Sequence, residues 1–192
     1  MRDVTVSRKT RETNIELKVN IDGQGLFQLD CQCAFMAHML EQIAIHGKID
    51  ISGFAKGDTE VDQHHTVEDL GLVMGEAIDL CLGSRTGLAR FGQSLTPMDD
   101  ALIMIALDLS GRSHLGWQVD FPVQRLGNFE TELVREFMQA FVNRAKAGLH
   151  IRQLAGHNTH HLVEAVFKGL GRALRQAVAI DSDSIPSSKG LL

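Results

Sequence analysis

The chain has 192 residues, of which 44% are hydrophobic and 22% are charged, and its formal net charge is −5. This composition is typical of a soluble globular protein with one substantial core, or with two small halves that share one. The acidic balance excludes an extended nucleic-acid-binding surface, because too few cations remain to neutralise phosphates. No segment is apolar over the length of a membrane span, and residues 1–13 lack the pattern of a signal or transit peptide. We therefore expect a cytoplasmic protein without a membrane partner.

The first half of the chain is predicted to begin with strands. Residues 14–21 alternate apolar and polar side chains, and Asp22-Gly23 follows as a turn. After Asp62, which can cap a helix, apolar residues recur at helical spacing. In chain order, the predicted elements are strands at 4–8, 14–21 and 26–31, a helix at 34–46, an extended segment at 48–55 and a helix at 64–82.

The second half repeats this order of elements. The predicted elements are strands at 88–95, 101–109 and 115–121, a helix at 129–147, a strand at 149–154 and a helix at 159–178. Asn158 stands directly before the last helix, where it is a favoured N-cap residue. The Ser-rich residues 181–192 are predicted to form a C-terminal arm without regular structure.

The last helix of each half begins with the same short motif. It reads His64-His65-Thr66-Val67-Glu68 in the first half and His160-His161-Leu162-Val163-Glu164 in the second, so matched positions lie 96 apart (64 and 160). We infer a duplicated module, strand-strand-strand-helix-strand-helix, and predict an α+β fold whose sheets pack against a shared helical layer. Residues 1–95 are the first repeat half, 96–180 the second and 181–192 the arm, and together they make one integrated catalytic unit.

The spacing within the motif predicts how its side chains are used. On a helix, residues i and i+4 lie on one face, whereas i and i+1 point about 100° apart. His64 can therefore act with Glu68, and His160 with Glu164, while the second histidine of each doublet points elsewhere. The simplest arrangement crosses the two helices and adds one further imidazole to each group. The two predicted metal sites are His64, Glu68, His161 and His150, and His160, Glu164, His65 and His38.

Such a donor set favours catalysis over a structural role. Three imidazoles and one carboxylate leave coordination positions open, which suits a catalytic first-row divalent ion. A single His-His pair at a helix start is more often a surface or capping feature, but two copies in register, each with an acid at i+4, favour metal binding. Asp62 and Glu60 either hydrogen-bond the outer ring nitrogens or are solvated acids at the end of a strand.

The segments around the two motifs are distinctive over a longer stretch. Gly57-Asp58-x-x-Val61-Asp62-x-His64-His65-Thr66-Val67-Glu68-Asp69 and Asn158-x-His160-His161-x-x-Glu164-Ala165-x-Phe167-Lys168 resemble the two signatures of the imidazoleglycerol-phosphate dehydratase family. Shorter matches to the same family cover nearly the whole chain. They are Arg11-Glu12-Thr13, His38-Met39-Leu40-x-Gln42, Arg90-Phe91-Gly92, Pro97-Met98-Asp99, Asp108-Leu109-Ser110-Gly111-Arg112, Thr131-Glu132-Leu133-Val134, Leu149-His150 and Pro186-Ser187-Ser188-Lys189-Gly190.

The resemblance implies a hydro-lyase of histidine biosynthesis that dehydrates imidazole glycerol phosphate to imidazole acetol phosphate. It implies two Mn²⁺ ions per active site, which hold the imidazole ring of the substrate as an imidazolate. It also implies a homo-oligomer of twenty-four subunits with active sites at subunit contacts. Glu12 is the implied catalytic acid or base beside the substrate. The other substrate-binding residues that the resemblance implies are Gln42, His46, Arg90, Arg112, Lys168, Ser187, Ser188 and Lys189.

Three positions near the predicted ligands depart from the family pattern. Ala37 and Gln63 stand where acids usually precede His38 and the first doublet, and Thr159 stands where an Asp is common. None of these departures removes a predicted ligand, but each takes away an acid beside the predicted ligands.

Two other functions fit the same histidine clusters. A dinuclear hydrolase would use the ions to activate water, although such sites usually rely on bridging carboxylates. A non-catalytic metal-binding assembly protein would clamp its subunits through coordinatively saturated ions, and it would need neither Glu12 nor the basic residues. Displacement of metal ligands by added azoles on the metal-loaded protein would indicate catalysis, whereas ions that do not exchange ligands would indicate a clamp.

Overall fold

A computed structural model describes residues 2–190 of the chain. The first half forms β1 (Asp3–Lys9), β2 (Thr13–Asn20), β3 (Phe27–Cys31), α1 (Ala34–Gly47), β4 (Asp50–Gly57) and α2 (His64–Leu82). The second half forms β5 (Phe91–Met98), β6 (Ala101–Asp108), β7 (His114–Gln118), β8 (Arg125–Leu126), β9 (Phe129–Glu130), α3 (Leu133–Ala145), β10 (Gly148–Ala155) and α4 (Thr159–Ala177). Apart from the short β8–β9 hairpin, the two halves have the same order of elements, as the repeat predicted.

The two large sheets have matching topologies. The first has the strand order β1-β2-β4-β3 and the second β5-β6-β10-β7. In each sheet the last strand runs parallel to its neighbour, β3 to β4 and β7 to β10, whereas the other pairs are antiparallel. Alternate residues of the inner strands, such as Ile15 and Leu17 in β2, are buried. Each sheet therefore turns one apolar face inward, as period-two alternation requires.

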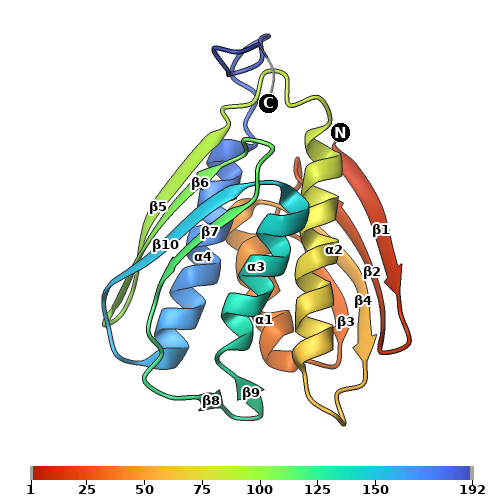
Figure 1. The fold of residues 1–192 in the computed structure, drawn as a ribbon, viewed down its shortest axis with the longest axis vertical. Coiled ribbons are helices and arrows are strands. Elements are labelled where there is room, and N and C mark those ends of the chain that lie inside the picture. The colour runs from red at the N-terminus through yellow and green to blue at the C-terminus, as the bar shows by residue number, and fades with distance from the viewer. Residues whose placement is uncertain (1, 191–192) are drawn as a thin grey trace.

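The four helices form one layer between the two sheets (Figure 1). α2 packs on β1 and β2, and α4 packs on β5 and β6. The halves then interleave, because α1 of the first half packs against α4 and α3 of the second half packs against α2. The predicted shared helical layer is confirmed, and it brings α1 and the start of α4 into contact.

Two glycines allow these helix pairs to approach closely. A Cβ atom on Gly171 of α4 would lie 2.9 Å from the carbonyl oxygen of Ile43 in α1. The matched residue of α2 is Gly75, where a Cβ atom would lie 2.3 Å from the carbonyl oxygen of Phe141 in α3. Only hydrogen fits at both positions, so the backbones of the paired helices touch.

The predicted helix at 129–147 is wrong at its start. Phe129 and Glu130 form β9, which pairs with β8, and α3 begins only at Leu133. Gly127 adopts the left-handed conformation (φ 62°) in the turn between the two strands, and Phe129 is fully buried. The hairpin, which local periodicity does not indicate, takes the place of the first helical turn.

The predicted strand at 88–95 is shifted along the chain. Arg90 has a left-handed backbone (φ 69°), and the residues before it pair with the segment after α4 through the Leu88–Ile180 bridge. β5 therefore starts at Phe91 and continues to Met98. The proposed division of the chain between residues 95 and 96 stays a prediction, and β5 runs across it.

The C-terminal arm was predicted at residues 181–192, of which 191 and 192 lie outside the described residues. Residues 181–190 contain bends and turns without helix or strand. Within residues 2–190, no helix combines the length and apolarity that crossing a membrane requires.

Gly75→Ala is expected to lower the free energy of unfolding. Overpacking of this kind costs about 1–3 kcal/mol, which exceeds the gain of about 1 kcal/mol that alanine has over glycine within a helix. Urea unfolding at one fixed protein concentration measures the difference. Gly148→Ala is the control, because the nearest atoms to its added methyl group lie 3.9 Å away. An equal loss in both variants would contradict the packing role of Gly75.

Candidate active site

The start of α4 places two predicted ligands side by side. Asn158 caps the helix, and its side-chain oxygen accepts hydrogen bonds from the backbone N–H groups of His160 (3.0 Å) and His161 (3.3 Å). One turn later the Glu164 carboxylate reaches back, with Oε2 at 3.2 Å from Nε2 of His160. The i, i+4 pairing predicted from the motif is therefore present in the structure.

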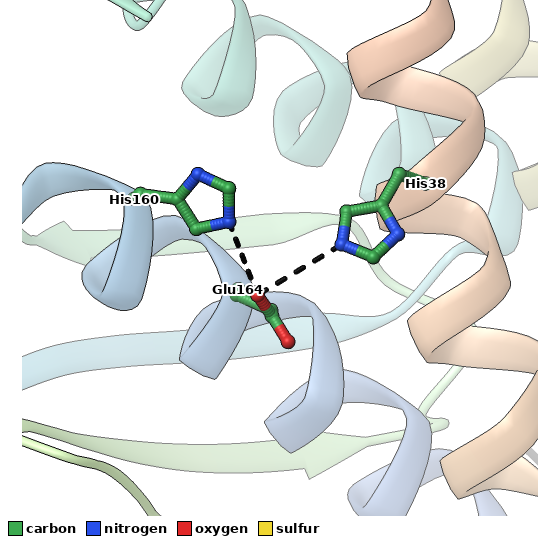
Figure 2. A group of neighbouring side chains, drawn as sticks. All are labelled: His38, His160 and Glu164. Carbon is green, nitrogen blue, oxygen red and sulfur yellow. Dashed lines mark ion pairs between the residues drawn. The ribbon is translucent and has the colours of Figure 1, made fainter.

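His38 of α1 completes a group of three donors with this pair. Its Nε2 lies 3.9 Å from Oε2 of Glu164, and one ligand atom from each of the three residues falls within 4.8 Å of the others (Figure 2). Behind His38, the buried Gln42 donates a hydrogen bond to the His38 carbonyl oxygen (3.3 Å) and approaches its Nδ1 (3.4 Å). We refer to His38, His160 and Glu164 as the donor group.

Glu164 is the charged centre of the donor group. Its side chain is only 10% exposed, and Oε1 accepts an ion pair from Nζ of Lys168 at 2.6 Å. Burial opposes ionisation of this carboxyl, but Lys168, His38 and His160 outweigh it, so the pKa of Glu164 lies below its usual value. One carboxylate oxygen is thus neutralised by lysine, while the other faces the two imidazoles.

Aromatic packing holds the His160 ring. The edge of the His160 imidazole meets Phe35 at 5.5 Å between ring centroids, and Phe35 in turn packs on Phe129 at 4.8 Å. The short β8–β9 hairpin therefore supports a donor residue through Phe35. Sequence periodicity did not indicate this role, because Phe129 is far from His160 in the chain.

The second histidine of each doublet is held by a carboxylate. Nδ1 of His161 lies 2.7 Å from Asp100, and Nδ1 of His65 lies 3.1 Å from Asp58. Asp100 also accepts the backbone N–H groups of His157 and Asn158, and these bonds, with that of His161, lower the pKa of the Asp100 carboxyl. The hydrogen bond that His65 donates to the Asp58 carboxylate raises the pKa of the His65 imidazole. A carboxylate on Nδ1 orients a histidine for binding through Nε2.

These carboxylates correct one interpretation of the sequence. Of the two roles predicted for Asp62, a partner of an outer ring nitrogen or a solvated acid, the structure shows neither alone, because the exposed Asp62 carboxylate accepts the backbone N–H of His64 (2.7 Å) at the start of α2. Asp58 takes the partner role for His65 instead. Asp58 belongs to the first motif, but no role was predicted for it, because it lies seven residues before His65 and outside the helix.

The remaining predicted ligands are not gathered within one chain. Among residues 2–190, the donor group is the only cluster of three or more His, Cys, Asp or Glu side chains close enough to share an ion. Glu68 is exposed at the start of α2, where His64 lies beside His65. His150 is exposed on β10, next to His114. The two predicted four-residue sites stay predictions, and one chain assembles three members of the second.

The predicted substrate-binding residues divide between two places. Gln42 and Lys168 border the donor group, and the half-buried His46 lies one turn further along α1, where burial and the charges of Lys168 and Arg172 lower its pKa. Glu12 is exposed near the start of α2, and its carbonyl oxygen accepts the backbone N–H of Asp58 (3.0 Å).

The other basic residues lie at the opposite end of the helical layer. The backbone N–H of Arg90 bonds to Ala177 at the end of α4, about 25 Å along the helix axis from His160. The Arg90 guanidinium binds Asp108 (2.7 Å) and the carbonyl oxygen of Pro186 (2.7 Å). The second bond attaches the C-terminal arm to the second sheet. The same end contains the exposed Arg112, which follows β6, and the arm residues Ser187, Ser188 and Lys189.

Comparisons with known proteins assign the family. The family model of imidazoleglycerol-phosphate dehydratase matches residues 31–174. A protein named imidazoleglycerol-phosphate dehydratase from Moorella thermoacetica is 52% identical over 100% of this chain and 98% of its own length. This chain belongs to the imidazoleglycerol-phosphate dehydratase family.

Other relatives of the dehydratase family agree. A Synechococcus protein with the same name is 50% identical over 100% of this chain and 96% of its own length. The crystal structure of the Pyrococcus furiosus dehydratase superposes with a TM-score of 0.85 at 34% identity, covering 97% of this chain and 100% of that one. The Staphylococcus aureus structure gives 0.84 at 31% identity, covering 93% and 99%. The predicted α+β fold and the predicted class, a hydro-lyase of histidine biosynthesis, are confirmed.

The donor group of this dehydratase-family chain fits a divalent metal ion. Its two imidazole nitrogens and one carboxylate oxygen are the mixed donors that first-row ions prefer, and no thiolate is present among the three. Glu164 is held in its charged form, and Gln42 and Phe35 fix the orientation of the two rings. Three protein donors would leave coordination positions for a substrate or for further ligands.

Asp58→Asn is expected to lower the pKa of His65 in the metal-free protein. The folded chain favours the His65 imidazolium because of Asp58, so the pairing stabilises the protein below about pH 6.5 and the contribution is lost as pH rises through the raised pKa. NMR titration of the imidazole protons measures the change. Asp62→Asn is the control, since Asp62 bonds a backbone N–H and has the smallest effect of the groups that raise the pKa of His65. A fall in the His65 pKa that is no larger in Asp58→Asn than in Asp62→Asn would disprove the assignment.

Proposed function

We propose that this chain dehydrates imidazole glycerol phosphate to imidazole acetol phosphate, the step of histidine biosynthesis that its relatives' name describes. The observation that carries the proposal is the donor group, in which two helices bring together two imidazoles and a carboxylate. The chain that forms this group is 52% identical to a protein named as the dehydratase. Family membership supports the substrate, and the geometry supports a metal-dependent route.

The proposed site holds two ions. The donor group, with His65, forms one set of ligands, and His64, Glu68, His161 and His150 form the other. The carboxylates on Nδ1 of His65 and His161 support this assignment, because they orient Nε2 of each ring for coordination. Nε2 of His161 lies 3.6 Å from the exposed Asp99, which an ion would displace. When bound, two divalent ions (Mn²⁺ by the family resemblance) would supply Lewis acidity to the substrate's imidazole ring, which would favour the anionic form of the ring and the loss of the neighbouring hydroxyl.

The side chains of the protein supply the remaining steps. The Glu12 carboxylate accepts the proton of the neighbouring side-chain carbon, and this proton and the departed hydroxyl make up the water that is lost. The resulting enol becomes the ketone when the carbon next to the ring gains a proton and the enol oxygen loses one. Glu12 is exposed but lies close enough to His65 for its charge to raise the pKa of that residue. Lys168, with Gln42 and His46 beside the donor group, receives the polar side chain of the substrate.

The phosphate-binding residues come from a second copy of the chain. Arg90, Arg112, Ser187, Ser188 and Lys189 are separated from the donor group by most of the length of α4, far more than a three-carbon phosphate ester spans. Guanidinium and ammonium groups suit a phosphate. We therefore propose a homo-oligomer with active sites at subunit contacts, of twenty-four chains by the family resemblance, working in the cytoplasm.

Two rival functions are disfavoured by particular observations. In a dinuclear hydrolase, a carboxylate usually bridges the ions, but one oxygen of Glu164 is bonded to Lys168. A structural metal clamp needs no cation beside its ligands, whereas Lys168 binds the Glu164 carboxylate of the donor group.

Removal of the metal tests the proposed reaction. We expect the purified protein to form the product ketone from imidazole glycerol phosphate, to lose this activity on chelation and to recover it with Mn²⁺. Free triazole should inhibit the loaded enzyme by occupying open metal positions. Full activity after complete chelation, or loaded protein inert to azoles and substrate alike, would refute the proposal.

Mixing of variants tests whether the site is shared. His160→Ala and Lys189→Ala each impair one end of the chain, and co-expression should restore about a quarter of the sites, since random assembly pairs two intact ends at that frequency. The matched control mixes His160→Ala with Glu164→Gln, which impair the same end and should not complement. Recovery no greater than the sum of the separate activities would place the whole site within one chain.

A further inference from the structure

His150 is the predicted ligand whose orientation most needs an explanation. It lies on β10 with its side chain exposed on the outer face of the second sheet, away from the helical layer. An exposed imidazole has several rotamers available, and ordering it on metal binding costs conformational entropy. A ligand in this position binds well only if its neighbours restrict the ring beforehand.

The residue directly opposite His150 is Gly116 on the parallel strand β7. A Cβ atom at Gly116 would lie 2.4 Å from Nδ1 of His150, 3.0 Å from Cε1 and 3.1 Å from Cγ. The imidazole therefore occupies the space that any other side chain would fill. A glycine within a strand commonly marks such a close approach.

The geometry also distinguishes the two ring nitrogens. The three atoms nearest to position 116 include Nδ1 but not Nε2. The ring thus turns its Nδ1 edge toward β7 and leaves Nε2 on the edge further from that strand. This is the orientation in which Nε2 is available to an ion.

His114 borders the same ring on a second side. It lies two residues before Gly116 on the same face of β7, and its ring centroid is 5.1 Å from that of His150 with a tilt of 44°. Neighbouring rings at this separation restrict one another by packing. His150 is thus held between the bare backbone at Gly116 and the ring of His114.

We propose that Gly116 and His114 are positioning residues that fix the His150 imidazole for metal binding through Nε2. The inference rests on the proposed function, since that assigns His150 as a ligand. Neither residue touches the substrate or the ion. Their contribution is to metal affinity at the site that includes His150, and not to the donor group at the start of α4.

The test compares two glycines on neighbouring strands of the same sheet. Metal-free, full-length Gly116→Ala and Gly148→Ala are titrated with Mn²⁺, and free Mn²⁺ is measured by electron paramagnetic resonance. Gly148 precedes His150 by two residues on the same face of β10, but the nearest atoms to an added methyl group there lie 3.9 Å away. We expect Gly116→Ala to lower the affinity for one of the two ions on the order of tenfold, as loss of a residue that supports a ligand does. Gly148→Ala should leave the affinity for both ions unchanged.

Further variants keep the test decisive. His150→Ala should no longer bind one ion, and His114→Ala should bind the same ion with lower affinity. His114→Phe, which keeps a ring at that position, should bind it with wild-type affinity. If Gly116→Ala does not fold, the two His114 variants decide the question. Wild-type affinity in Gly116→Ala or His114→Ala, when His150→Ala loses an ion, would overturn this inference alone. Two ions bound with wild-type affinity by His150→Ala would instead remove His150 from the proposed site.

Discussion

The donor group depends on the close contact between α1 and α4. The backbone of α1 approaches α4 at Gly171, where a Cβ atom would lie 2.9 Å from the carbonyl oxygen of Ile43. The helices run in the same direction, so this contact near their C-terminal ends brings His38 and Glu164 together nearer their starts. The charge on Glu164 then has a lysine on one side and two imidazoles on the other. A wider helix spacing would separate the ligands without changing either helix.

The duplication is symmetric in fold and asymmetric in chemistry. α2 and α3 make the same type of contact at Gly75, where Phe141 takes the place of Ile43. Counted from these contacts, the position of His38 in α1 corresponds to Glu136 in α3, so the second pair of helices has no matching imidazole. The proposed site around His64 and Glu68 therefore takes its extra histidine from a strand. This difference explains why one chain assembles a donor group at α4 and not at α2.

The sequence predicted what local spacing determines. The doublets at the helix starts, the pairing of His160 with the acid at i+4 and the Asn158 cap all involve residues within one helical turn, and the structure contains them as expected. The supporting residues Phe35 and Asp100 were missed because their partners are distant in the chain. The predicted helix start at residue 129 was wrong for a related reason. The β8–β9 hairpin that occupies residues 129 and 130 is stabilised by burial of Phe129 and not by local propensity. In the proposed oligomer, the chain that supplies each ligand depends on contacts between copies, and no spacing along one chain encodes such contacts.

The separation of the donor group from the C-terminal arm has a geometric consequence. A site that joins the start of α4 in one copy to the arm of another uses two different surfaces of the chain. A twofold contact can join these surfaces reciprocally and then stops at a dimer, whereas a heterologous contact joins them once for each pair of copies, and its repetition either closes into a ring or continues without end as a filament. The angle between the two surfaces on a single chain, set by the helical layer between the sheets, therefore determines whether a finite particle forms. The helix packing that aligns the donor group would then also limit the size of the assembly.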